Sequence, residues 1–232
     1  MAGQRVLGVD ACKAGWVGIA LATGGARAYV STSIAGLVDT VEVDGRLDVV
    51  AVDMPIGLPD AGRRQADVLA RKMVGPRWSS VFVTPVRAAL ELEPSDFASA
   101  NAVNRERAGE GISAQAFGLR PKLLEVDRWV RLGTHRVVEV HPEVSFARLA
   151  GAPLTERKTT WAGAVRRRRL LAAAGIVLDD DLGGAGRAAG VDDVLDAAVV
   201  AWTARRVARG EAEHLPDPPQ RFGDGIDCAI WS

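Results

Sequence analysis

The sequence has little cysteine. Cys12 and Cys228 are the two thiols in 232 residues, and two cysteines so far apart predict neither a disulfide framework nor a zinc site. The first residues show no charged segment followed by an apolar one, and no apolar run approaches the length of a membrane span. We therefore expect a cytoplasmic protein that does not contact a membrane.

The sequence also lacks an excess of charge of either sign. It has 29 lysines and arginines against 29 aspartates and glutamates, so the formal net charge is zero. Proteins that bind nucleic acid often carry a basic excess. Any attraction to phosphate must therefore come from local patches, which counts against a protein that grips long duplex DNA unaided.

What the chain does have is enough apolar residues for a core. Hydrophobic residues make up 48% of its length, and 232 residues suit one domain with a large insertion. Short apolar segments with tight connections predict three antiparallel strands. A continuous apolar segment predicts a fourth strand that is covered on both faces. With a fifth, the expected strands are 5–9, 16–21, 27–31, 48–52 and 136–140.

Helical spacing surrounds these strands. A helix is expected at 33–41, and residues of about 60–135 form a largely helical insertion between strands four and five, with irregular chain between its helices. The loop 182–190 is expected to be flexible, and the Pro-rich tail from Leu215 to be extended. The other expected helices are 62–73, 118–131, 144–150, 160–174 and 191–209. This order predicts an α/β fold of the ribonuclease H-like type, a mixed five-stranded sheet flanked by helices in a single domain, 1–232.

Acidic residues fall where this fold would bring them to one edge of the sheet. Asp10 and Asp53 end the first and fourth strands, and Glu139 lies near the end of the fifth. Ligands of open α/β sheets bind just beyond such strand ends. Glu143 and His141 follow the fifth strand. On the late helix, Asp193 and Asp196 share one face because they are three residues apart.

Clustered carboxylates repel one another unless a cation lies between them. Mg²⁺ and Mn²⁺ prefer oxygen ligands, and two such ions about 4 Å apart can bind both the attacking and the leaving oxygen of a phosphodiester. The pattern thus predicts metal-dependent phosphodiester hydrolysis on nucleic acid or a nucleotide-like substrate. The expected ligands are Asp10, Asp53, Glu139 and Asp193, with Asp196, Glu143 and His141 as further catalytic candidates.

Each of these acids also fits a purely structural role. An aspartate after a strand is often a turn or cap residue, and Asp192, Asp193 and Asp196 fit acids near a helix N-terminus. A non-catalytic binding or scaffold protein on the same fold would have these acids spread apart or paired with arginines. An actin-like ATPase would need two such domains, for which the chain is too short.

Seven motifs in order resemble one family across nearly the whole chain. They are GVDACKAGWVG (8–18), DMPIGLP (53–59), Arg64-x-x-Asp67-x-x-Ala70-Arg71, the run at 75–87, GISAQAFGLRPKLLEVD (111–127), EVHPEVSF (139–146) and DDVLDAAVVAWTA (192–204). The sequence resembles the DUF429 family. This resemblance implies a nuclease of the ribonuclease H-like fold. Ala11 and Ala14 replace glycines of the opening motif, so the loop after Asp10 is expected to differ.

The resemblance also directs attention to polar residues of the insertion. Arginine suits bidentate phosphate binding, so these residues are candidates for holding a phosphate-bearing substrate over the carboxylates. The alternative is that they pair with Asp67, Glu125 and Asp127 in a structural network. The candidates are Arg64, Arg71, Arg77, Arg87, Gln115 and Lys122.

Overall fold

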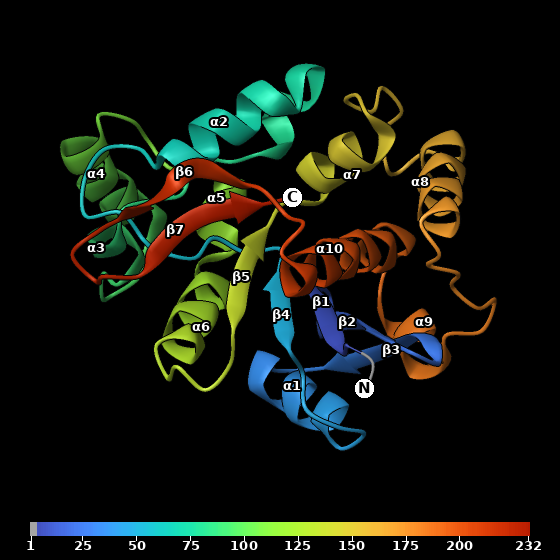
Figure 1. Cartoon of the computed structure of the whole chain (residues 1–232). Coiled ribbons are helices and arrows are strands. Elements are labelled where there is room, and N and C mark those ends of the chain that lie inside the picture. The colour runs from blue at the N-terminus through green and yellow to red at the C-terminus, as the bar shows by residue number, and fades with distance from the viewer. Residues whose placement is uncertain (1–3) are drawn as a thin grey trace.

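A mixed sheet forms the centre of the protein in the computed structural model, which describes residues 4–232 (Figure 1). The sheet has seven strands in the order β3-β2-β1-β4-β5-β7-β6. The first three strands pair antiparallel, while β4, β5 and β7 add in parallel and β6 closes the far edge antiparallel. The strands are β1 (Val6–Cys12), β2 (Gly15–Ala22), β3 (Gly25–Ser31), β4 (Val49–Val52), β5 (Val137–Val140), β6 (His214–Arg221) and β7 (Asp227–Trp231).

The expected mixed α/β sheet flanked by helices is confirmed, but the expectation of five strands is wrong. The tail after Leu215 is not merely extended, because it folds back as the hairpin β6–β7 and extends the sheet beyond β5. Prolines obscure β6 in the sequence. Proline lacks the N–H that a central strand needs and is tolerated at a sheet edge, where β6 lies. Its pairing with β7 is irregular between Leu215 and Gln220.

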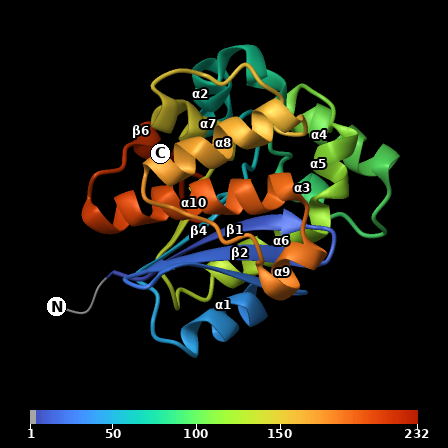
Figure 2. The same ribbon diagram turned by 90° about the vertical axis from the view of Figure 1, so that its right-hand side faces the viewer.

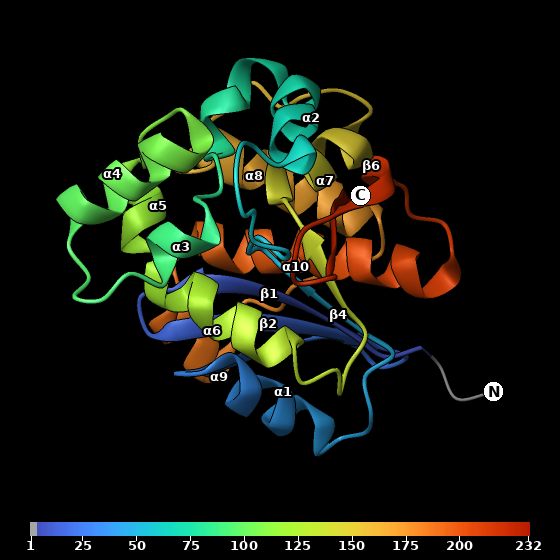
Figure 3. The same cartoon turned by 90° about the vertical axis from the view of Figure 1, so that its left-hand side faces the viewer.

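Helices cover both faces of the sheet (Figures 2 and 3). Alternate side chains of a strand point to opposite faces. On one face, Val49 and Ala51 pack in a core with apolar residues of α10 (Val191–Arg209). On the other, Val50 and Val52 pack with α1 (Ile34–Glu42) and α6 (Arg120–Val130). The helices outside the β4–β5 connection are α1 (Ile34–Glu42), α7 (Pro142–Ala150), α8 (Trp161–Ala173), α9 (Gly183–Ala188) and α10 (Val191–Arg209).

The connection between β4 and β5 contains the expected helical insertion. Irregular chain was expected between the helices at 62–73 and 118–131, but the structure has the 3-10 helix η1 (Gly75–Ser80) and the helices α3 (Arg87–Leu90), α4 (Phe97–Ala108) and α5 (Ala114–Gly118) there. Likewise, α9 replaces part of the flexible loop expected at 182–190. The helices of the insertion are α2 (Gln65–Met73), the 3-10 helix η1 (Gly75–Ser80), α3 (Arg87–Leu90), α4 (Phe97–Ala108), α5 (Ala114–Gly118) and α6 (Arg120–Val130).

The long helix α10 lies unusually close to β1. A Cβ atom built on Gly8 would lie 2.0 Å from the backbone nitrogen of Ala201 and 2.3 Å from the carbonyl oxygen of Ala197. Only glycine therefore permits this approach. Because Gly8 precedes Asp10 by two residues and Ala197 follows Asp196, the same contact brings two acids toward each other.

The helices of residues 4–232 are too short or too polar to cross a bilayer. None of them combines the length and the apolar character that a membrane span requires.

Candidate metal centre

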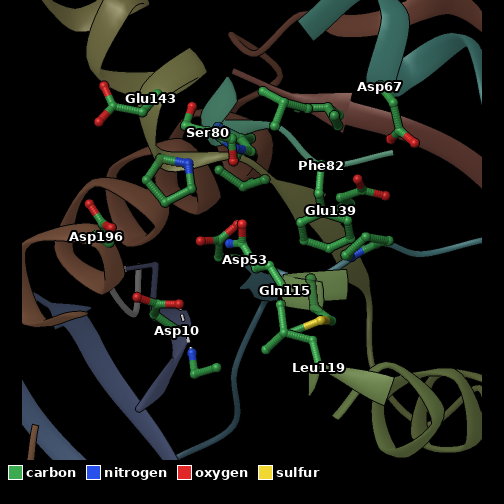
Figure 4. Close-up of a pocket in the computed structure, with 18 of the residues that line it drawn as sticks. Asp10, Asp53, Asp67, Ser80, Phe82, Gln115, Leu119, Glu139, Glu143 and Asp196 are labelled. Atoms are coloured by element: carbon green, nitrogen blue, oxygen red, sulfur yellow. Dashed lines mark hydrogen bonds between the residues drawn. The ribbon is translucent and has the colours of Figure 1, made fainter. Parts of the chain in front are cut away.

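A cavity of about 230 Å³ opens at the carboxyl ends of the parallel strands (Figure 4). One wall is acidic and contains Asp10, Asp53 and Asp196, while Phe82 and Leu119 contribute to an apolar wall. The cavity therefore lies at the sheet edge where the sequence predicts a site.

Asp10, Asp53 and Asp196 form the tightest acidic group in residues 4–232. Each offers a carboxylate oxygen, and these atoms all lie within 4.8 Å of one another. Asp10 comes from β1 and Asp196 from α10, while Asp53 follows β4 directly, its N–H donating to the carbonyl of Val9 at 2.8 Å. Figure 4 shows the three side chains gathered on one side of the cavity. We call them the aspartate triad.

Burial makes the triad electrostatically costly. Loss of hydration and the neighbouring carboxylates raise the pKa values of Asp10 and Asp53 well above their usual range. Burial also raises the pKa of Asp196 to about 6, although Lys158 opposes the shift. A cation among these oxygens would offset the repulsion.

One oxygen of the triad has nothing to bind within the described chain. Asp196 is 2% exposed, and its Oδ1 atom is buried without a hydrogen-bond partner in residues 4–232. Leaving a buried polar atom unpaired is costly. Three carboxylates from separate elements and one orphaned oxygen fit a hard divalent ion, whose ligands are oxygens.

Glu139 lies outside the triad, although the sequence places it among the metal ligands. Both of its oxygens accept hydrogen bonds from the Nη2 atom of Arg64, at 2.6 and 2.7 Å, and Oε2 accepts another from the N–H of Ile56. Burial raises the pKa of Glu139 to about 7 against the opposing influence of Arg64. Its charge is compensated within the protein.

Glu143 and Asp193 line the cavity but are also engaged elsewhere. The Oε1 atom of Glu143 accepts a hydrogen bond of 2.6 Å from the buried Arg167. Asp193 accepts one of 3.1 Å from the N–H of Gly190 and so caps α10. The expected ligand set therefore differs from the observed group, in which Asp196 joins Asp10 and Asp53.

The expected substrate-binding arginines are tied to other parts of the protein. Arg64 also contacts Asp67, at 3.5 Å, and Arg87 binds Asp127 through two hydrogen bonds of 2.9 Å. Both pairs are those expected if these arginines belong to a structural network instead of a substrate site.

The remaining candidates behave similarly. Arg71 donates to the carbonyl of Val81 and Arg77 to that of Thr155, both at 2.7 Å. Lys122 donates to the carbonyl of Gly15 and lies over the ring of Trp16. Of the six candidates, all within the described chain, Gln115 alone lines the cavity.

His141 lines the cavity at the start of α7. Its Nε2 atom lies 3.3 Å from the carbonyl oxygen of Ser80. Because a carbonyl only accepts, Nε2 carries the hydrogen, and in a neutral ring Nδ1 is then the proton acceptor. Burial lowers the pKa of His141, and Nδ1 is buried without a partner among residues 4–232. The ring therefore offers a base at the cavity.

The sequence reasoning missed Lys158, which also lines the cavity. Its ammonium lies 2.5 Å from Oδ2 of Asp196 and 3.8 Å from Oδ2 of Asp192. A single lysine in the loop between α7 and α8 has no local signal, since only the fold brings it to the triad. The position of Asp196 does indicate a functional role. It lies beyond the first turn of α10 among buried apolar residues, where an acid has no capping role.

Comparison with known proteins gives a family without an assigned activity. No curated protein and no solved structure matches the chain. The family model described as "Protein of unknown function (DUF429)" matches residues 8–221. Since that match covers nearly all of the 232 residues, the chain belongs to the DUF429 family.

Proposed function

We propose that this chain is a divalent-metal-dependent phosphodiesterase that acts on nucleic acid or a nucleotide-like substrate, with Mg²⁺ or Mn²⁺ as its cofactor. The observation that carries the proposal is the aspartate triad, in which one carboxylate oxygen of each residue lies within 4.8 Å of the others. Three like charges held this close in a buried site favour a cation. The proposal extends to the fold, which we assign to the ribonuclease H-like type.

The strand order supports that assignment. Strands β3, β2, β1, β4 and β5 run in the sequence of pairings expected for a ribonuclease H-like sheet, antiparallel first and then parallel. Asp10 lies in β1, and Asp53 directly follows β4, the strand that pairs with β1 in parallel. The hairpin β6–β7 extends that sheet at the edge beyond β5 and contributes no residue to the triad.

The residues of the cavity suit the reaction in separate ways. Asp10, Asp53 and Asp196 would hold the ion, which supplies charge stabilisation at a phosphodiester and lowers the pKa of water. The Nδ1 atom of His141 can accept a proton from attacking water. Gln115, exposed on α5 at the rim, can donate to or accept from a nucleotide.

A scaffold protein is the competing function, and one observation favours it. Two of the cavity acids, Glu139 and Glu143, are neutralised by buried arginines, as a structural network requires. The triad is the part that this alternative leaves unexplained, since none of its carboxylates forms an ion pair with an arginine in residues 4–232.

Cleavage assays separate the two functions. Single-stranded, duplex, hybrid and branched oligonucleotides would be incubated with Mn²⁺ and either the natural chain or Asp10→Asn. We expect cleavage of at least one substrate class and a loss of at least 100-fold in Asp10→Asn, as for removal of a metal ligand. Asp39→Asn, a change on the exposed side of α1, is the matched control. Equal activity in Asp10→Asn would contradict the proposed mechanism.

A further inference from the structure

The loop between α7 and α8 delivers a lysine to the triad. Lys158 donates to Oδ2 of Asp196 at 2.5 Å, while Oδ1 of the same carboxylate is left without a partner in the described chain. Lys158 therefore occupies one edge of the acidic group and leaves another edge open. Its side chain is 38% exposed and lines the cavity.

Buried and half-buried arginines fix the path of this loop. Arg77 donates to the carbonyl of Thr155 at 2.7 Å, and Arg167 donates to the carbonyl of Glu156 at 3.1 Å. Arg167 is fully buried and also binds Glu143. The two arginines thus hold the backbone on the N-terminal side of Lys158, and its position at the triad is built into the fold.

The charges of the triad can be counted apart from the other acids that line the cavity, because those acids have partners of their own. Glu139 and Asp67 share Arg64, Glu143 binds Arg167, and Asp193 accepts a hydrogen bond from the N–H of Gly190. The three aspartates of the triad remain, and Lys158 supplies one positive charge against them. Three negative charges and one positive charge leave two negative charges, which one divalent ion balances. A second divalent ion would give the buried site an excess of positive charge, which is costly there.

We propose that Lys158 is a built-in second cation, so that the triad binds a single divalent ion rather than two. This inference rests on the proposed metal site and makes it more specific. The ion binds at the open edge of the triad, at the side of Oδ1 of Asp196, and the ammonium stays on Oδ2. Together they present two positive centres to a substrate phosphate.

The number of ions bound tests this directly, without any measurement of activity. Mn²⁺ alone is titrated into the full chain by calorimetry, and free Mn²⁺ is followed by electron paramagnetic resonance. The natural chain should bind one ion. Lys158→Met should bind its first ion at least tenfold more tightly or take up a second ion, because a positive charge next to the site is gone. Lys158→Arg keeps the charge and should still bind one.

Lys72→Met is the matched control, since Lys72 is exposed on α2 and does not line the cavity. Thermal melts verify that each variant folds. Two ions in the natural chain, or unchanged stoichiometry and affinity in Lys158→Met, would overturn the inference and leave the proposed function standing. Binding in Lys158→Met but none in the natural chain would also overturn it, since the lysine would then block the site. No ion in either protein would remove both proposals.

Discussion

The guanidinium of Arg64 binds both carboxylate oxygens of Glu139 at 2.6 and 2.7 Å, and the arginine is completely buried. Arg64 precedes α2 and Glu139 lies in β5, so the pair fastens the insertion to the central sheet. The pair also neutralises a carboxylate that lines the cavity. Charge at this edge is therefore distributed unequally: Glu139 is paired with a buried arginine, whereas the three aspartates of the triad face the single ammonium of Lys158.

Removing Arg64 should destabilise the protein strongly. Arg64→Met leaves Glu139 buried without its partner, and breaking a buried pair from one side costs about 3–5 kcal/mol. Urea unfolding at pH 8 measures this. The loss should shrink at pH 5, because Glu139, whose pKa is already raised to about 7, can then bind a proton.

Two further variants make this prediction specific. Arg64→Met combined with Glu139→Gln should recover more than half of the loss, since no uncompensated charge remains. Arg63→Met, which removes an exposed pair with Glu110, should cost less than about 1 kcal/mol. Equal losses in the Arg63 and Arg64 variants would contradict the importance of burial.

The glycine of β1 should be essential for the site as well as for the core. In Gly8→Ala, the new methyl group would overlap the backbone of α10 at Ala201, and forcing the two elements apart moves Asp196 away from Asp10. We expect the free energy of unfolding to fall by about 3 kcal/mol or more. We also expect the affinity for Mn²⁺ to fall at least tenfold. Chemical unfolding and calorimetry measure the two effects. Gly24→Ala, in open space at the β2–β3 turn, should leave both unchanged.

Much of the sheet could be predicted because its strands carry local signals. The apolar run ending at Asp53 and the short turn at Gly24 identify β4 and the β2–β3 hairpin from a few neighbouring residues. The hairpin β6–β7 lacks such signals, because prolines interrupt β6 and β7 contains a single β-branched residue, Ile230. Its place in the sheet depends on the pairing of β7 with β5, in which Ile230 lies opposite Glu139, 91 residues earlier in the chain.

The site could be predicted in part for the same reason. Asp10 and Asp53 follow from strand ends, which the sequence reveals. Choosing Asp196 over Asp193 depends on which face of α10 meets β1, and Lys158 reaches the triad only through a loop held by distant arginines. Glu139 occupies a strand-end position like Asp53, but the sequence does not reveal that Arg64 is buried against it.

The metal-free protein should lose stability as the pH rises. An acid whose pKa is higher in the folded than in the unfolded state binds protons more tightly when folded, so unfolding releases protons and higher pH favours it. For Asp196 the pKa rises from 3.8 to about 6. Its contribution to stability is therefore lost mainly between pH 3.8 and about pH 6. Burial raises the pKa values of Asp10 and Asp53 as well, which adds to the decline.

Asp10→Asn should lessen that decline. The amide keeps the oxygen that accepts from the N–H of Ala11 and removes one of three repelling charges. At pH 8 without metal, we expect the free energy of unfolding to increase by about 1 kcal/mol. This corresponds to roughly 2–4 °C in melting temperature for a chain of this length. Thermal melts at pH 5 and pH 8 test it, with Asp39→Asn as the unchanged control. A variant less stable than the natural chain at pH 8 would mean that the triad is not under repulsive strain.

Divalent ions should offset the loss of stability that the natural chain shows as the pH rises. A ligand that binds only the folded state stabilises it by about 2.7 kcal/mol at a concentration 100 times its Kd, and the triad binds a cation best when its carboxylates are ionised. Mn²⁺ should therefore raise the melting temperature by several degrees at pH 8 and by much less at pH 5, where protons compete for Asp196. Asp10→Asn should lose most of this gain while Asp39→Asn keeps it. An equal gain for both variants would place the ion elsewhere on the protein, because only one of the two changes touches the triad.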